Sequence, residues 1–139
     1  MACLQTQTPL DNALSGHMAV IRYTIFMKLP HYKSVVVRPE KVTAYLLSEV
    51  HPNGRHKARF FMQFGFSISN WQQLEKALVK HAEEHEVTGV EPSPFGTRYV
   101  IEGNIESPDM RNPRIRSVWF IETESVIPYF VTAYPLEGK

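Results

Sequence analysis

The sequence has 139 residues, which suits one compact domain and hardly two. Hydrophobic residues make up 43% and charged residues 21%, so the chain can build a packed core and global disorder is not expected. The formal net charge of +1 does not identify a nucleic-acid binder, and no apolar run is long enough to span a membrane. A single cysteine, Cys3, excludes an internal disulfide framework and a multi-cysteine metal site. We expect a cytoplasmic protein of mixed structure that needs no cofactor.

The first 26 residues differ from the rest of the chain. They are polar and turn-rich up to Gly16, without the basic and apolar regions of a secretory signal. The run from Val20 to Phe26 is rich in β-branched and aromatic residues and predicts a short strand. We treat residues 1–26 as an N-terminal extension of unknown status and residues 27–139 as a single domain.

Three helices are predicted after a brief extended run of valines at 35–37. Pro39 suits the first position of a helix over Glu40–Glu49, because the N–H that proline lacks would have no partner there. The Pro-Asn-Gly sequence after His51 ends this helix. A second helix is expected over Arg55–Phe64, with Gly65 as its C-cap, and a third over Asn70–His85, capped by Ser67 or Ser69.

The pattern then changes from helical to alternating. Strands are predicted over Thr97–Glu106, Arg114–Thr123 and Val126–Tyr134, with a further one at Glu86–Val90 as an option. The short turns between them imply an antiparallel meander. We therefore expect an α+β domain with N-terminal helices packed on a C-terminal antiparallel β-meander of three to four strands.

Although the net charge is nearly neutral, basic and acidic residues are concentrated in different parts of the sequence. Seven basic residues fall in three places, and no acidic residue lies within 51–59 or 111–116. If the second helix lies near the second long strand, these residues form a basic cleft suited to a phosphate-rich ligand. The alternative is that they are scattered solvated side chains. The seven are Arg55, Lys57, Arg59, Arg98, Arg111, Arg114 and Arg116.

Lys57 is the most informative of these residues. On a helical wheel it falls within the apolar arc, between Phe61 and Phe64, and it sits at the positive end of the helix dipole. An ammonium group held there needs a partner or a cleft, which favours a functional role. The alternative is that Lys57 extends past the core to a carboxylate such as Glu102.

Alternation along the strands brings further polar groups together. Arg116 shares a sheet face with Val118 and Phe120, while Thr132 and Tyr134 share a face of the next strand. In a suitable register the guanidinium, hydroxyl and phenol converge and can bind an oxyanion. The alternative is ordinary sheet composition, because Thr and Tyr have high strand propensity.

Other motifs are weak or missing. The sequence contains no glycine-rich phosphate loop and no dinucleotide-binding pattern. His81 and His85 lie four residues apart and could share a metal, but a third ligand is not evident, so we interpret them as part of a solvated helix face. His51 begins the Pro-Asn-Gly loop. His56 lies on the polar arc beside Lys57 and is either a proton-exchanging group or a solvated one.

Four segments carry a resemblance to a known family: HPNGRHKARFF at 51–61, FGTRYVIEG at 95–103, RIRSVW at 114–119 and VTAYP at 131–135. Together they resemble an uncharacterised bacterial domain that occurs in stand-alone proteins, often beside antitoxin-like genes. The same domain occurs at the C-terminal ends of polymorphic toxins. The layout is also similar to toxin nucleases of the barnase, EndoU, colicin and RelE type, in which helices precede an antiparallel meander.

The resemblance implies metal-independent RNA cleavage, in which a ribose 2′-OH attacks the adjacent phosphate and leaves a 2′,3′-cyclic end. Such chemistry needs a base, an acid and cations that stabilise the pentavalent phosphate. Lys57 and Arg116 would stabilise the phosphate, and His51 or His56 would act as base or acid. Thr132 and Tyr134 would position the phosphate. RNA-binding residues would be Arg55, Arg59, Arg98, Tyr99 and Arg114, with Tyr99 and Trp119 as stacking platforms.

We therefore expect a bacterial ribonuclease toxin domain that acts in the cytoplasm on RNA and is neutralised by a cognate antitoxin or immunity protein. One alternative is a non-catalytic nucleic-acid- or protein-binding module that uses the same basic face. Another is an antitoxin-like or structural partner, whose function would survive loss of Lys57. No membrane partner is expected.

Overall fold

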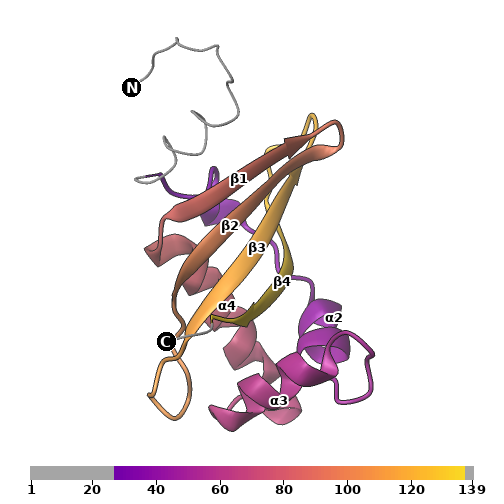
Figure 1. The fold of residues 1–139 in the computed structure, drawn as a ribbon, viewed down its shortest axis with the longest axis vertical. Coiled ribbons are helices and arrows are strands. Elements are labelled where there is room, and N and C mark those ends of the chain that lie inside the picture. Colours follow the sequence, from indigo (N-terminus) through magenta and orange to yellow (C-terminus); the bar gives the residue numbers. More distant parts are fainter. Residues whose placement is uncertain (1–26, 137–139) are drawn as a thin grey trace.

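The computed structural model describes residues 27–136, with helices in the first part of this range and a four-stranded antiparallel sheet in the second (Figure 1). The α+β class and the antiparallel meander are thus confirmed. The strand predicted over Val20–Phe26 and the single cysteine, Cys3, lie outside the described residues.

The first helical segment differs from the prediction. After a 3-10 turn, η2 (Tyr32–Ser34), helix α2 (Pro39–Lys41) begins with proline in its first turn, as expected. It continues directly as a short π-helix, η3 (Val42–Leu46), and the N–H of Leu47 donates to the carbonyl of Val42 at 2.8 Å. The prediction of a regular helix over Glu40–Glu49 is therefore wrong in both the type and the length of the helix. The wider π turn places Val42, Leu46 and Leu47 together in the core.

The next two helices match their predicted positions to within one residue. Helix α3 (Arg55–Gln63) ends before Gly65, whose φ of 104° favours glycine and lets the N–H of Phe66 donate to the carbonyl of Phe61. Ser67 then forms a capping box with Asn70 around the 3-10 turn η4 (Ile68–Asn70). Helix α4 (Trp71–Glu84) follows without a break.

The sheet consists of β1 (Val87–Ser93), β2 (Gly96–Asn104), β3 (Arg114–Glu122) and β4 (Tyr129–Pro135), in chain order. The optional first strand is thus real and extends to Ser93. β4 begins three residues later than predicted.

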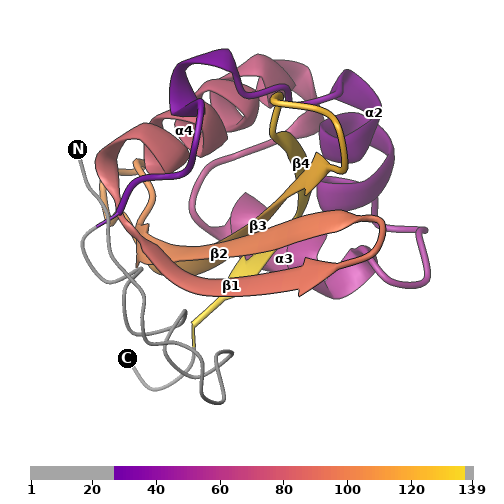
Figure 2. The same ribbon diagram turned by 90° about the horizontal axis from the view of Figure 1, so that it is seen from above.

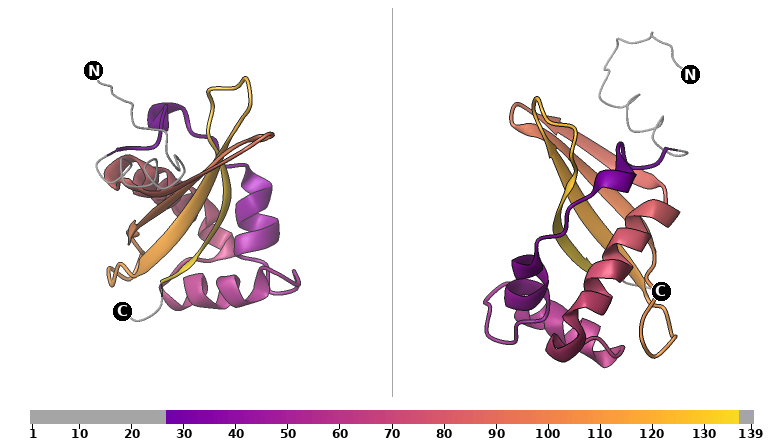
Figure 3. Two further views of the ribbon diagram at one scale, coloured as in Figure 1. Left: turned by 45° about the horizontal axis from the view of Figure 1, so that its top comes forward. Right: turned by 180° about the vertical axis from the view of Figure 1, so that it is seen from behind.

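Helix α4 lies across one face of the sheet, whereas α2 and α3 lie beside and below β4 (Figures 2 and 3). The expectation that helices pack on the sheet is thus confirmed for α4, which covers a face, while α2 and α3 contact the edge strand β4. Alternation along β3 directs Ile115, Ser117 and Trp119 into the core, while Arg116 belongs to the opposite face. The largest fully buried apolar side chains come from the segment before η2, from η3, α3 and the loop after it, from α4 and from the sheet: Trp119, Phe61, Phe66, Phe130, Leu29, Leu46, Leu74 and Leu78.

The interpretation of His81 as part of a solvated helix face is wrong. Its side chain is 1% exposed, its Nδ1 lies 2.9 Å from Oγ of Ser117, and its Nε2 lies 3.1 Å from the carbonyl oxygen of Gly103. Trp119 donates its indole N–H to the same Ser117 oxygen at 2.9 Å. Since that oxygen accepts from Trp119, its own proton is free for His81 Nδ1, and Nε2–H donates to Gly103. Every polar atom of this buried network is thus satisfied.

His85, one turn later, is half-buried rather than solvated. Its Nε2 lies 2.9 Å from the carbonyl oxygen of Asn104, and its ring packs on Gly103, where a Cβ would lie 2.6 Å from Nδ1. Through these contacts the two histidines fasten the end of α4 to β2 and β3.

Burial lowers the pKa of His81 to about 4, with a smaller contribution from the neighbouring His85.

Candidate functional site

The Tyr45 side chain connects the helical segments to the edge of the sheet. Its hydroxyl lies 2.9 Å from Oγ1 of Thr132 on β4. The ammonium nitrogens of Lys41 and Lys57 lie 5.4 and 5.5 Å from its ring centre, and the His51 ring meets it edge-on at 5.0 Å. Two cations, two hydroxyls and an imidazole thus meet around one aromatic ring, which we call the Tyr45 cluster: Lys41, Tyr45, His51, Lys57 and Thr132.

Lys57 is half-buried, as its place on the apolar arc predicts. Its ammonium donates to the carbonyl oxygen of Asn53 at 3.1 Å and lies beside the Tyr45 ring. It does not reach Glu102, which forms an ion pair with Arg116 instead. Within residues 27–136, neither Lys57 nor Lys41 is in an ion pair, so both ammonium groups keep their charge available to a ligand.

His51 has a structural task in addition to its place in the cluster. Its Nδ1 accepts the backbone N–H groups of Asn53 and Gly54, at 3.0 and 3.1 Å, and so satisfies donors in the loop that leads into α3. This leaves Nε2 as the protonated nitrogen, a hydrogen-bond donor and not a base. His56, the other predicted acid or base, is exposed on α3, and its side chain has no hydrogen-bond partner among the described residues.

Close packing fixes the loop against η3. A Cβ on Gly54 would clash with the carbonyl oxygen of Tyr45. Glycine at this position therefore lets the start of α3 approach Tyr45, and this approach brings Lys57 to the Tyr45 ring.

The register of the sheet brings the predicted strand residues together. Arg116 pairs with Glu102 on one side and Tyr134 on the other, and Val118 pairs with Thr132, so Arg116, Thr132 and Tyr134 share one face as predicted. Arg116 donates through Nε to Glu102 at 2.8 Å and through a terminal nitrogen to the Tyr134 hydroxyl at 3.3 Å. These two hydrogen bonds raise the pKa of Arg116. Its charge is thus shared with a carboxylate of the protein.

The predicted RNA-binding residues do not line a single cleft. Arg55 and Arg59 are exposed on α3, and Arg114 is exposed at the start of β3. Arg98 is in an ion pair with Glu91 on β1 at 2.8 Å. Arg111, in the loop before β3, pairs with Asp109 and lies over the Phe64 ring.

Trp119 is not a stacking platform for RNA bases, because it is fully buried, and the half-buried Tyr99 lies beside it. They are paired across β2 and β3 on the face that packs toward α4. Trp119 is fully buried, and burial raises the pKa of Tyr99. Tyr99 is one position after Arg98 and Trp119 is three positions after Arg116, and these odd offsets direct both aromatic side chains to the core face.

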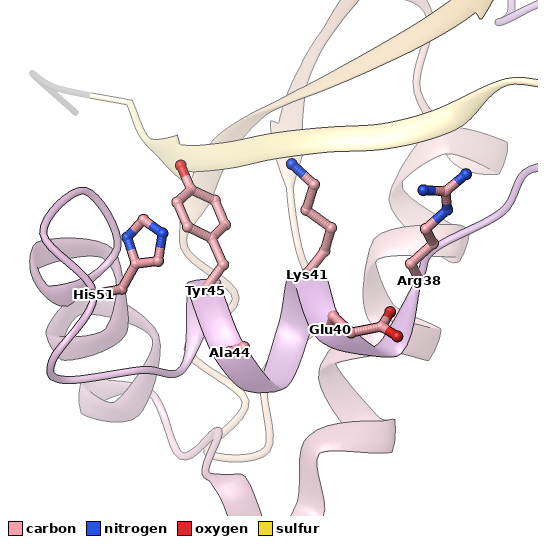
Figure 4. Close-up of a pocket in the computed structure, with 6 residues that line it drawn as sticks. All are labelled: Arg38, Glu40, Lys41, Ala44, Tyr45 and His51. Carbon is pink, nitrogen blue, oxygen red and sulfur yellow. The ribbon is translucent and has the colours of Figure 1, made fainter.

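Sequence reasoning missed three residues of the site: Tyr45 as its centre, and Lys41 and Arg38 beside it. They line a pocket of about 520 Å³ along α2 and η3, together with Glu40, Ala44 and His51 (Figure 4). The available signal was the i, i+4 spacing of Lys41 and Tyr45 on one helix face. That this face meets β4 depends on tertiary packing.

The family model described as "Domain of unknown function (DUF6883)" matches residues 28–137. No curated protein and no solved structure matches the chain. Within residues 27–136, no helix is long and apolar enough to cross a membrane, and no group of three or more metal-ligating side chains is assembled.

Proposed function

The chain belongs to the DUF6883 family, and we propose that it binds RNA at the Tyr45 cluster and cleaves the phosphodiester chain there without a metal ion. The observation that carries this proposal is the convergence of the Lys41 and Lys57 ammonium groups on the Tyr45 ring, whose hydroxyl is bonded to Thr132. Half-buried cations without ion-pair partners among the described residues suit a ligand that brings its own negative charge.

The reaction follows from these groups. The ribose 2′-oxygen attacks the adjacent phosphorus. The bond between this phosphorus and the 5′-oxygen of the next nucleotide breaks, and a 2′,3′-cyclic phosphate remains. Lys41 and Lys57 stabilise the additional negative charge of the pentavalent phosphate, and His51 Nε2–H donates to a phosphate oxygen. The 2′-OH proton leaves to solvent, the Tyr45 hydroxyl supplies a proton to the departing 5′-oxygen, and the Tyr45 phenolate then regains a proton from solvent. Without a side chain that acts as base, we expect slow turnover that rises with pH.

A toxin role extends this proposal. A ribonuclease that damages cellular RNA needs a neutralising partner, and an acidic surface of an antitoxin or immunity protein would complement Lys41 and Lys57. Growth arrest on expression, with fragmented RNA and relief by Lys57→Ala, is the expected cellular result.

A specific observation favours a second candidate, a non-catalytic RNA-binding module. The Nδ1 lone pair of His51 is used by two backbone N–H groups, and Arg116 is held by Glu102. Such a module would need the cations of the cluster but no proton transfer.

Incubation of the purified chain with an end-labelled single-stranded RNA, in the presence of a chelator, tests the proposal. We expect fragments with 2′,3′-cyclic ends, no cleavage of the matching DNA, and a loss of about 100-fold or more in Lys57→Ala. Lys76→Ala is the matched control, because Lys76 is exposed on α4 away from the Tyr45 cluster. RNA that binds to the chain but stays intact would replace the nuclease with the binding module.

A further inference from the structure

The pocket beside the Tyr45 cluster has a distinct polar layout. Figure 4 shows Arg38, just before α2, Lys41 in α2 and Tyr45 in η3 directed toward β4, with His51 at the far end and Glu40 near Arg38. Lys41 donates to the carbonyl oxygen of Val131 at 3.0 Å, which holds its ammonium group at the pocket. Ala44 is the one small side chain among these lining residues, so it leaves space between Glu40 and His51.

We propose that this pocket is a nucleotide-binding subsite that holds one phosphorylated nucleoside, the unit next to the cleaved bond. The identification as a subsite of RNA rests on the proposed function, whereas nucleotide binding itself does not. The pocket volume of about 520 Å³ is within the range of small-molecule sites. The pocket and the cluster share Lys41, Tyr45 and His51, so a chain bound in one runs directly into the other.

The charges assign the orientation of the ligand. Arg38 and Lys41 are the cations of the pocket, and neither is in an ion pair among residues 27–136. They are placed to bind the phosphate group. Glu40, which is exposed, supplies a carboxylate near Arg38 that can accept hydrogen bonds from a ligand. A nucleotide fits this layout, because its phosphate suits the two cations and its ribose hydroxyls or base amino groups can donate to Glu40, whereas inorganic phosphate uses the cations alone.

A binding titration with the full chain tests this directly. The probes are adenosine 5′-monophosphate and inorganic phosphate, followed by NMR or calorimetry. We expect saturable binding of the nucleotide at least 10-fold tighter than that of inorganic phosphate. Ala44→Leu fills the space and should weaken nucleotide binding 10-fold or more. Because Ala44 is exposed on η3, the variant should keep its fold, which circular dichroism checks.

Thr43→Leu is the matched control. It adds a similar side chain at the neighbouring position, which lines the groove on the other side of η3 and not this pocket. Equal affinities of the wild type and Ala44→Leu would overturn the proposal, and so would a wild type that prefers inorganic phosphate or binds neither probe.

A second measurement separates this proposal from the cleavage reaction. If the chain cleaves RNA, Ala44→Leu should raise KM for a six-nucleotide RNA about 10-fold, whereas Thr43→Leu should leave this KM unchanged. Nucleotide binding lost in Ala44→Leu, with no RNA cleavage by the wild type, would support the pocket and reject the nuclease. RNA cleavage with identical KM in both proteins would reject the pocket and support the nuclease.

Discussion

The Tyr45 hydroxyl and Oγ1 of Thr132, 87 residues apart in the chain, lie 2.9 Å from each other and join η3 to β4. This contact holds the Tyr45 ring at the sheet edge, where the two lysines reach it. It therefore has a structural value that is measurable without any ligand.

We expect Tyr45→Phe and Thr132→Val each to lower the free energy of unfolding by about 1 kcal/mol, because each removes one partner of a half-buried hydrogen bond. The double variant should cost less than the two single changes together, since the bond can be lost only once. Urea unfolding of the four proteins measures this. Additive losses would show that the two hydroxyls do not stabilise each other.

The buried His81 predicts a dependence of stability on pH. Its pKa is about 4 in the folded protein and near 6.5 when unfolded, because burial disfavours the charged imidazole. Between these values the unfolded chain binds the proton and the folded chain does not, so stability is complete above pH 6.5 and falls as the pH drops toward 4. The full loss is about 3 kcal/mol.

Carboxylates contribute to the same profile, so the comparison between variants is decisive. His81→Asn should be less stable at neutral pH and lose this part of the pH dependence. His56→Asn, at an exposed position on α3, should keep the wild-type profile. Parallel profiles for the wild type and His81→Asn between pH 4 and 6.5 would refute the assignment.

Local sequence signals predict α3, α4 and the strands, because their hydrophobic periods and turn residues agree with the final packing. The helical period also indicates that His81 is buried, because it lies three residues after Leu78 and seven after Leu74 on the buried stripe of α4. A polar residue at such a position is nevertheless expected to be exposed, since a histidine is buried only when hydrogen-bond partners from distant strands satisfy it. Ser117 and Gly103 are such partners, and local spacing does not reveal them.

The candidate site was likewise predictable where local patterns determine it and unpredictable where tertiary contacts do. Parity along the strands places Arg116, Thr132 and Tyr134 on one face, and the register confirms it. The pairing of Arg116 with Glu102 also follows from the register, which sequence alone does not fix. The Tyr45 cluster depends on how η3 meets β4, a tertiary contact without a local signature.

Gly54 tests whether the approach of α3 to η3 positions Lys57. Gly54→Ala would place a methyl group against the Tyr45 carbonyl and should cost about 1–3 kcal/mol of stability. We expect it also to reduce RNA binding in protein that remains folded, because Lys57 moves away from the ring. Gly89→Ala is the control, since its Cβ would meet Val100 at an ordinary 3.6 Å. Folded Gly54→Ala that binds RNA as tightly as the wild type would contradict this role.

Glu102 limits the charge that Arg116 offers to a ligand. Suppose that RNA lies over Arg116 and Tyr134. Glu102→Gln then removes a negative charge of the protein that repels the RNA, and it frees the Arg116 guanidinium for a phosphate. We expect tighter binding of single-stranded RNA, and a slope of log K against log salt that is steeper by about 0.7, the value for one further phosphate contact. Fluorescence anisotropy between 50 and 200 mM salt, roughly the range over which such slopes are resolved, measures both quantities.

Glu91→Gln is the matched control for this prediction. It breaks the ion pair of Arg98 on the same face of the sheet, two strands away from Thr132 and Tyr134. An RNA path confined to the β3–β4 side should leave this variant with the wild-type slope. Equal steepening in both variants would mean that RNA responds to the overall charge of the face. An unchanged slope in Glu102→Gln would remove Arg116 from the RNA path and leave it as a cross-strand ion pair of the sheet.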